Sequence, residues 1–138
     1  MCNCYLPALW LSSNLPQKPE RLMNSPQTNI DQATQRAAQA FIARISSQYD
    51  LAEAVLFGSR ARRTHRPDSD ADIAVVLRGP HGQRADAAVN MAGIAFDVML
   101  ETGVLIEAVP LWEDEWAHPE HFNNPALIAN IRRDGVRL

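Results

Sequence analysis

A phosphate-binding turn is the first chemistry that this sequence suggests. The apolar run 55–57 stops at Gly58-Ser59, and Arg60 follows directly. A strand that ends in glycine and serine and then turns into a helix presents unpaired backbone N–H groups, which bind phosphate well. The Ser59 hydroxyl and the charges of Arg60, Arg62 and Arg63 would add to this binding. A Gly-Ser turn is by itself more often an ordinary turn, so the assignment depends on its neighbours.

Two aspartates, Asp70 and Asp72, follow the turn, with ten residues between Ser59 and Asp70. They begin the run 70–77, whose β-branched residues predict a strand. Residues two apart on a strand point to the same face, so both carboxylates should project together. Like charges this close repel unless a divalent cation lies between them, and oxygen ligands favour Mg²⁺ or Mn²⁺ over Zn²⁺. The alternative is a solvated, aspartate-rich turn.

A third carboxylate, Asp97, lies within the apolar run 94–100, which we expect to be a strand. Aspartate is disfavoured in strands and in buried positions, so a lone carboxylate there needs a partner. If this strand pairs with 70–77, Asp97 can join Asp70 and Asp72. Three carboxylates beside a phosphate-binding turn make a two-metal phosphoryl-transfer site.

The elements that must position these residues are helices and strands in alternation. Apolar residues recur at three- and four-residue steps after Asn29, a potential cap, which predicts a helix to about residue 47. Asn124 and Pro125 predict the start of a last helix, with Gly135 in a left-handed conformation just past its end. Between them we expect a helix at 82–92 and four strands, at 51–59 including its closing turn, 70–77, 94–100 and 104–112. Pro110 indicates that the last of these is an edge strand.

This order predicts an α+β fold, a small mixed sheet of about four strands packed by helices. The 138 residues suit one domain, and 46% hydrophobic with 21% charged residues is a globular balance. Residues 1–28 carry four of the nine prolines and show no period. We therefore expect an irregular, flexible N-terminal extension at 1–28 and a domain at 29–138.

Composition also excludes several classes of function. A net charge of −3 weighs against nucleic-acid binding by bulk electrostatics. The two cysteines, Cys2 and Cys4, rule out a disulfide framework and supply at most half a zinc site. The apolar segment Tyr5–Leu11 is too short to span a bilayer. We therefore expect a protein of the cytoplasm that does not enter a membrane.

The run 57–77 resembles the minimal nucleotidyltransferase family of the DNA polymerase beta superfamily. The pattern of that family is Gly-Ser, ten residues, Asp-x-Asp and a third acid on a later strand. The similarity extends over about 29–138, and Arg63 stands where many relatives carry glycine. The positions that match the pattern are Gly58, Ser59, Asp70, Asp72 and Asp97.

The resemblance implies a polymerase-beta-like fold and an Mg²⁺-dependent transfer of a nucleoside monophosphate, AMP from ATP, to a hydroxyl group. Two Mg²⁺ ions would bridge the triphosphate, and the hydroxyl would attack the α-phosphorus. The resemblance assigns metal binding and catalysis to Asp70, Asp72 and Asp97, and phosphate binding to Gly58, Ser59 and Arg60.

Single-domain members of this family resemble the antitoxin half of bacterial toxin–antitoxin pairs. There the partner is a HEPN-type ribonuclease toxin, and the modified hydroxyl belongs to a tyrosine of it. A binding module that neutralises its partner by contact is one alternative, and an aminoglycoside-type, small-molecule nucleotidyltransferase is another. Three converging acids favour an enzyme over a binding module. The nucleotide, the acceptor and the oligomeric state stay open.

Overall fold

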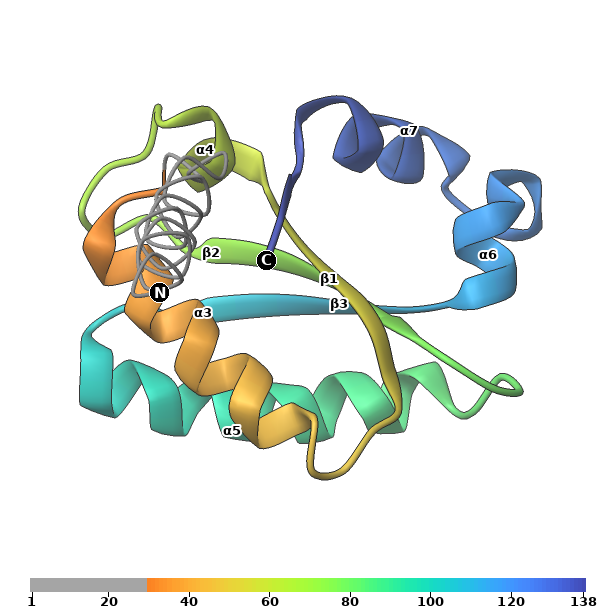
Figure 1. Ribbon diagram of the computed structural model, residues 1–138, viewed down its shortest axis with the longest axis horizontal. Coiled ribbons are helices and arrows are strands. Elements are labelled where there is room, and N and C mark those ends of the chain that lie inside the picture. Colours follow the sequence, from red (N-terminus) through yellow and green to blue (C-terminus); the bar gives the residue numbers. More distant parts are fainter. Residues whose placement is uncertain (1–29) are drawn as a thin grey trace, which may run out of the picture.

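The computed structural model describes residues 30–138, which build a four-stranded mixed sheet between helices (Figure 1). The strand order is β3-β2-β1-β4. β1 runs antiparallel to β2 and to β4, whereas β2 and β3 run parallel. The expected α+β fold with about four strands is confirmed, while the extension expected at 1–28 lies outside the described residues. The strands are β1 (Leu51–Phe57), β2 (Ala71–Leu77), β3 (Ile106–Trp112) and β4 (Val136–Arg137).

Helices cover both faces of the sheet and divide the core into two clusters. On one face, Phe41 of α3 and Met91 of α5 belong to a cluster with Ile73 of β2. On the other face, Ile128 of α7 belongs to a cluster with Val55 of β1. Figure 1 shows α3 and α5 on one side of the strands and α6 and α7 on the other. The helices are α3 (Gln32–Ile45), α4 (Gly58–Arg62), α5 (Arg84–Thr102), α6 (Glu113–Ala117) and α7 (Pro125–Asp134), with a 3₁₀ turn η3 (Pro119–His121).

The segment around Asp97 differs most from the sequence interpretation. We expected a helix over 82–92 and a strand over 94–100, but α5 continues through both without a break. A short apolar run is compatible with either structure, and here the helical period extends through it. The strand prediction is therefore wrong. The buried residues of α5 recur at three- and four-residue steps, at Ala87, Met91, Ala95 and Val98.

The end of the chain follows the prediction in its last helix and departs from it at Gly135. Asn124 caps α7, and Pro125 is its first residue, as expected. Gly135 is extended, with φ of −73°, instead of left-handed. Glycine is needed there because a Cβ would lie 2.3 Å from the carbonyl oxygen of Ile131 and 2.5 Å from Cγ1 of Val55. This close approach brings the last residues alongside β1 as β4.

Two smaller expectations concern β3 and the start of α3. β3 is an edge strand, as Pro110 indicated. α3 is capped by Asp31, whose Oδ1 accepts a hydrogen bond from the backbone N of Thr34 at 3.0 Å. Asn29, the expected cap, lies outside the described residues. No helix in the described range 30–138 is both long and apolar enough to cross a membrane.

Candidate active site

Strand register places three carboxylates at one end of the sheet. Asp70 directly precedes β2, and Asp72 is its second residue. Asp72 lies opposite Glu107 of the parallel strand β3 and opposite Phe57, the last residue of β1. Paired residues on neighbouring strands point to the same face of a sheet. The side chains of Asp72 and Glu107 therefore project side by side from one face.

The acids lie on the face that α7 covers. Ala74 and Val109 stand two residues beyond Asp72 and Glu107 on their strands, and so share their face. Ala74 belongs to the cluster that includes Ile128 of α7, and Val109 packs against this cluster. The face of the sheet that packs against α3 and α5 is the opposite one.

Gly58 brings the chain directly against Asp72. β1 ends at Phe57, and Gly58 opens α4 with φ of 73°, a conformation that favours glycine. A Cβ at this position would lie 2.2 Å from Oδ2 of Asp72, so the carboxylate packs on the backbone of the turn. Ser59 follows as a half-buried residue of α4. The structure thus brings the Gly-Ser turn and the paired aspartates together, as the sequence predicted.

The charges around Asp72 show how close the carboxylates are. Burial raises the pKa of Asp72, and the negative charges of Glu107 and Asp70 raise it further. Arg62 acts in the opposite direction and lowers it. Repulsion of this kind is relieved when a divalent cation binds between the acids.

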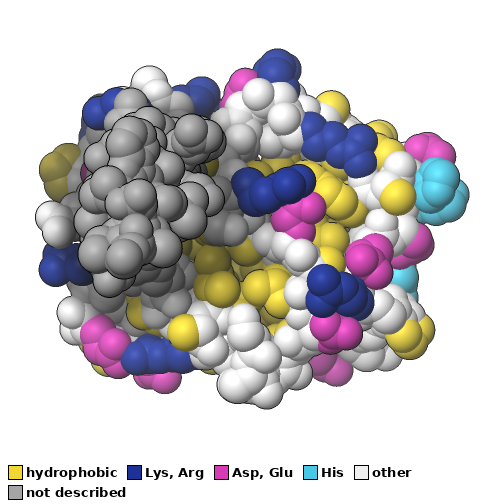
Figure 2. Space-filling view, in the orientation of Figure 1, with side chains coloured by type: hydrophobic (Ala, Val, Ile, Leu, Met, Phe, Trp, Pro, Cys, Tyr) yellow, Lys and Arg dark blue, Asp and Glu magenta, His cyan; other side chains and the backbone are white. Residues whose placement is uncertain are grey.

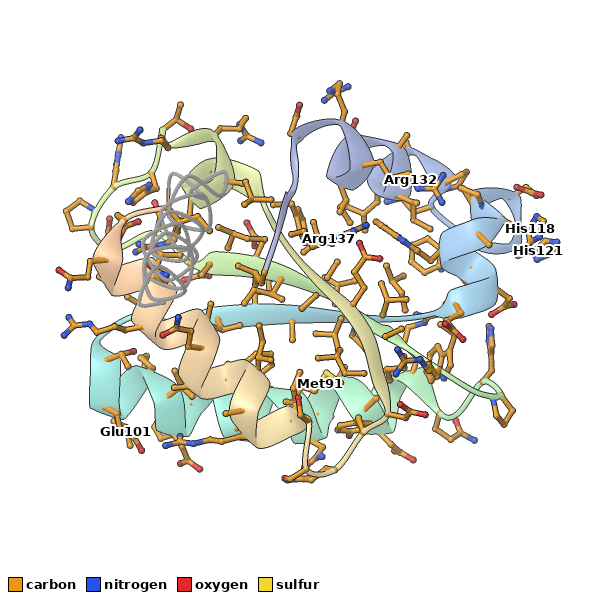
Figure 3. All side chains as sticks on the ribbon, in the orientation of Figure 1. Met91, Glu101, His118, His121, Arg132 and Arg137 are labelled. Atoms are coloured by element: carbon orange, nitrogen blue, oxygen red, sulfur yellow. The ribbon has the colours of Figure 1, made fainter. Side chains whose placement is uncertain are left out.

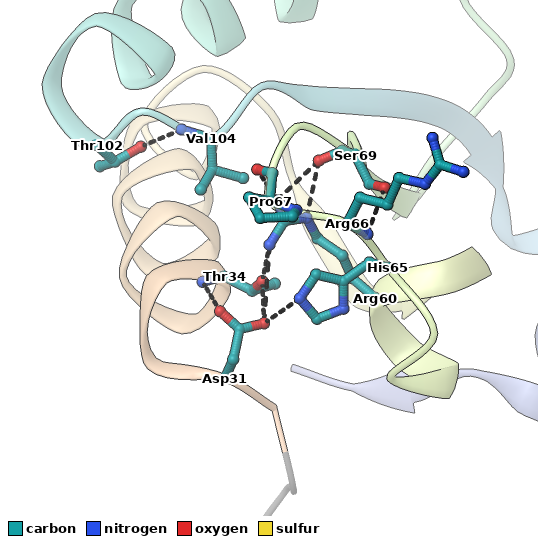
Figure 4. A network of polar contacts seen from close by, with 9 residues as sticks. All are labelled: Asp31, Thr34, Arg60, His65, Arg66, Pro67, Ser69, Thr102 and Val104. Carbon is teal, nitrogen blue, oxygen red and sulfur yellow. Dashed lines mark hydrogen bonds and ion pairs between the residues drawn. The ribbon is translucent and has the colours of Figure 1, made fainter.

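Arg60 does not lie where the sequence interpretation placed it. Its side chain is 3% exposed. Nε and Nη2 donate to the carbonyl oxygen of Ser69 at 2.9 and 2.8 Å, and Nη1 donates to Oγ1 of Thr34 at 2.7 Å (Figure 4). A buried guanidinium that already donates these bonds has no free edge for a phosphate. We therefore correct the expected role: Arg60 holds the loop that leads into Asp70.

The same loop is tied to the start of α3 through Asp31. Nε2 of His65 lies 3.3 Å from Oδ2 of Asp31, and Nη1 of Arg60 lies 3.7 Å from it (Figure 4). Burial opposes ionisation of Asp31, but hydrogen bonds from Thr34 and the charges of His65 and Arg60 outweigh it and lower its pKa. The network joins α3, α4 and the 63–70 loop, and so fixes where Asp70 enters the sheet.

Arg62 is the exposed cation at this site, one of the arginines that follow the Gly-Ser turn. It is exposed, and it makes no hydrogen bond or ion pair with another residue in the range 30–138. It lines a cavity of about 170 Å³ together with Gly58 and with Asn130 and Arg133 of α7. The sequence indicated positive charge from the arginines after the turn, but the phosphate-binding role was assigned to Arg60.

A larger, mostly apolar hollow lies away from the acids. Its volume is about 480 Å³, and its lining includes Ile42 of α3, Leu51 of β1 and Leu138 at the chain end. Figure 2 shows hydrophobic side chains near the middle of this view, with charged side chains around them. None of the residues that line this hollow is one of the site residues above.

Asp97 does not join the other acids. It is exposed on α5 and lines a cavity with Arg44 and Ser47 near the end of α3. The carboxylate is tolerated there because water solvates it, so it needs no metal or acidic partner. Glu107 takes the place that Asp97 was expected to fill. The signal for it was present, since Glu107 is also a lone acid in an apolar run, 104–112, which was correctly predicted as a strand.

Comparison with known proteins identifies a family for the chain. A family model described as a nucleotidyltransferase domain matches residues 39–128. The chain belongs to this family. Among solved structures, a candidate nucleotidyltransferase from Sulfolobus solfataricus is 20% identical, with a TM-score of 0.43, and the match covers 80% of this chain and 90% of that chain. Among curated proteins, no sequence matches the chain significantly.

Nucleotidyltransferase domains generally use a nucleoside triphosphate and a divalent metal, and the donor set here fits Mg²⁺. Asp70, Asp72 and Glu107 offer carboxylate oxygens alone, which Mg²⁺ prefers. Within residues 30–138, no three His, Cys, Asp or Glu side chains already converge as a set of metal ligands. Mg²⁺ is usually held by one or two carboxylates together with substrate phosphates, so a preformed protein cage is not required.

Proposed function

We propose that this nucleotidyltransferase transfers AMP from ATP to a hydroxyl group on a partner protein. The observation that carries the proposal is the pairing of Asp72 with Glu107 across parallel strands, directly beside the Gly58 turn. This arrangement places acids from two strands next to a glycine turn that can approach phosphate. It matches the pattern of Gly-Ser, Asp-x-Asp and an acid on a later strand, with Glu107 as the last acid.

The reaction is a substitution at the α-phosphorus of the nucleotide. The acceptor oxygen attacks in line, a new O–P bond forms, and the bond between the α-phosphorus and the pyrophosphate oxygen breaks. The proton of the acceptor hydroxyl passes to Glu107, and pyrophosphate leaves. Asp70 and Asp72 would hold Mg²⁺, which would supply positive charge for the phosphate oxygens.

Residues of the Gly-Ser turn and its helix hold the nucleotide for this step. The backbone at Gly58 and the hydroxyl of Ser59 bind the β- and γ-phosphates. Arg62 supplies the positive charge that was first expected from Arg60, because it lines the cavity beside Gly58 and makes no bond of its own within 30–138. Arg133 of α7 lines the same cavity, although it also pairs with Asp134 at 3.0 Å.

The acceptor that we propose is a tyrosine of a HEPN-type toxin, with this chain as its antitoxin. The support for it is the resemblance of the run 57–77 to minimal nucleotidyltransferases of toxin–antitoxin pairs. A binding module that acts by contact and an enzyme for small molecules of the aminoglycoside type are the alternatives. The site favours catalysis over contact alone, because acids that converge beside a phosphate-binding turn are needed for transfer and not for docking.

The test is the intact mass of the neighbouring gene's product after co-expression with this chain. With the wild type we expect a gain of one or more AMP units, located on tyrosine by fragmentation. The Asp70→Asn/Asp72→Asn variant should produce no gain, and the matched Asp97→Asn variant should behave as the wild type. An unchanged mass with both proteins still co-purifying would favour the binding module. Neither modification nor association would favour a small-molecule acceptor.

The donor is tested separately with the purified chain. Each of the four nucleoside triphosphates, labelled at the α-phosphate, is incubated with Mg²⁺ and the same partner. We expect label to pass from ATP in preference to the other three. Equal transfer from all four would overturn the choice of ATP and leave nucleotidyl transfer standing.

A further inference from the structure

The outer side of α5 is apolar along most of its length. Val89, Phe96 and Leu100 are 73%, 52% and 68% exposed. With Gly93 they follow one another at steps of four, three and four residues, which aligns them on one side of a helix. We call these four residues the α5 stripe. Among residues 30–138, it holds three of the five large hydrophobic side chains that are exposed.

The inner side of the same helix is also apolar. Figure 3 shows Met91 pointing from α5 towards the sheet, where it is fully buried. In Figure 1 the outer side of α5 faces away from the strands, and no other described element covers it. A helix that is hydrophobic on both sides is normally buried on both sides. The α5 stripe therefore has the character of a surface that another molecule covers.

Acidic side chains line one border of the α5 stripe. Asp86, Asp97 and Glu101 lie on this border, and α5 has no basic residue after Arg84. Glu101 pairs with Arg44 of α3 at 2.6 Å. Asp86 and Asp97 form no ion pair with any residue of the described range.

A cavity opens between this acidic border and α3. Its volume is about 500 Å³, and Leu100 of the α5 stripe lines it together with Asp97 and Glu101. Arg44 lines the same hollow and pairs with Glu101, so Asp97 is the acid there that has no ion-pair partner among residues 30–138. A long side chain with an apolar stem and a basic end matches such a hollow.

A second copy of the chain that docks through its own α5 does not satisfy these charges. A two-fold axis that pairs two α5 helices antiparallel sets the acidic border of one against the acidic border of the other. A parallel pair sets the acids against a border without basic residues, because residues 85–102 contain none. Like charges across an interface are unfavourable, and a positive border on the partner would be attractive.

We infer that the α5 stripe is the docking site for an amphipathic helix of a different protein, with Lys or Arg along the border that meets Asp86 and Asp97. The apolar face of that helix packs on Val89, Phe96 and Leu100, and Gly93 allows its backbone to come close. A basic side chain enters the cavity beside Asp97. The inference does not depend on the proposed function, since α5 and the acids of the active site lie on opposite faces of the sheet.

Two synthetic helical peptides test the inference. They carry the same apolar stripe and differ in one border, which is lysine in the first and glutamate in the second. Fluorescence anisotropy measures the affinity of each for the whole chain. We expect the lysine peptide to bind at least about tenfold more tightly, and the preference to weaken as salt is added. No binding of the lysine peptide, or equal affinity for both peptides, would overturn the inference.

Variants of the chain locate the binding and check its charge. Phe96→Glu should abolish binding of the lysine peptide, whereas the matched control Leu138→Glu, at an exposed leucine outside α5, should leave it unchanged. Asp86→Lys/Asp97→Lys should reverse the preference between the two peptides. Thermal melting confirms that each variant is folded, which we expect because all four positions are exposed. Equal loss in Phe96→Glu and Leu138→Glu would contradict the assigned surface.

Sedimentation of the wild type tests the competing occupant. We expect a monomer at concentrations where the lysine peptide binds. A dimer that Phe96→Glu converts to a monomer would show that a second copy covers the α5 stripe, and would overturn the inference.

Discussion

Segments 94–100 and 106–112 are alike in sequence and opposite in structure. Each is an apolar run with a single acid, Asp97 in the first and Glu107 in the second. The first continues α5 and leaves Asp97 exposed to water, while the second is strand β3 and sets Glu107 beside Asp72. The difference teaches that a lone acid in an apolar run marks a site only when its element reaches the other acids.

Gly103 separates the two segments and explains their difference. Its φ is 81°, and its N–H donates to the carbonyl oxygen of Met99 at 2.8 Å, which ends α5. A glycine in this conformation is a common helix end. A helix that ends at Gly103 includes Asp97, so the chain can form a strand only beyond it. The run 94–100 does not by itself indicate where the helix ends. Gly103, which follows the run, does.

Apart from loss of an active-site acid itself, the largest effect should come from the turn that supports Asp72. In Gly58→Ala, a Cβ would lie 2.2 Å from Oδ2 of Asp72, and φ of 73° would be strained. We expect transfer to fall by at least about 100-fold, because a misplaced catalytic group costs this much. Strain should destabilise the fold by roughly 1–3 kcal/mol. Steady-state kinetics and urea unfolding measure the two effects.

Gly79→Ala is the matched control for strain alone. Gly79 has φ of 88°, and nothing lies within 4 Å of the position that a Cβ would take. It should lose stability and keep transfer activity. Full activity in Gly58→Ala would mean that the turn does not position the active acids.

The next largest effect separates Arg60 from the phosphates. Arg60→Ala leaves buried acceptors on Ser69 and Thr34 without their donor. We expect a loss of roughly 2–4 kcal/mol of unfolding free energy, from bonds worth about 1.5–3 kcal/mol each to a charged group. In the folded fraction kcat should fall, since Asp70 shifts, while KM for the nucleotide stays near that of the wild type. A raised KM with unchanged stability would instead restore Arg60 as a phosphate ligand.

Substitution of Arg62 should weaken nucleotide binding without a loss of stability, the opposite of what we expect for Arg60. Arg62→Ala removes an exposed side chain beside the Gly58 cavity. We expect KM for the nucleotide to rise about tenfold, since one charge-assisted hydrogen bond of about 1.5 kcal/mol is lost, and the unfolding midpoint to stay unchanged. Arg66→Ala, at an exposed arginine that does not line this cavity, is the control. An equal rise in KM for both variants would show a general charge effect.

The smallest effect is on the titration of Asp72. Its pKa is raised in the folded chain, so the native state holds this proton more tightly than the unfolded state does. The metal-free protein should therefore lose stability as the pH rises from the ordinary aspartate pKa through the raised one. Glu107→Gln should lower the pKa of Asp72, and Asp97→Asn should leave it unchanged. Carboxyl NMR titration measures it, and a shift in Asp97→Asn would contradict the separation of the two acids.

Much of the site could be predicted because it depends on short-range signals. The Gly58 turn, the start of β2 and the spacing of Asp70 and Asp72 lie within one continuous segment. The edge position of β3 followed from Pro110 alone. The helix α7 followed from Asn124 and its neighbour.

What could not be predicted depends on contacts between distant residues. Thr34 and Ser69 occupy the guanidinium of Arg60 from two other segments, so Arg60 is not free to bind a phosphate, as Arg62 is proposed to do. The pairing of Asp72 with Glu107 depends on the parallel register of β2 and β3. Neither appears in a local pattern of residue types.

Transfer by Glu107→Gln and Asp97→Asn, measured side by side as Mg²⁺-dependent pyrophosphate release with the partner at saturating concentration, tests the central claim most directly. Glu107→Gln should reduce the rate by about 1,000-fold, since a carboxylate at the reacting phosphate contributes several kcal/mol, while Asp97→Asn should retain the wild-type rate. Both variants should melt as cooperatively as the wild type. A wild-type rate for Glu107→Gln together with a large loss for Asp97→Asn would contradict the placement of the active centre on β2 and β3.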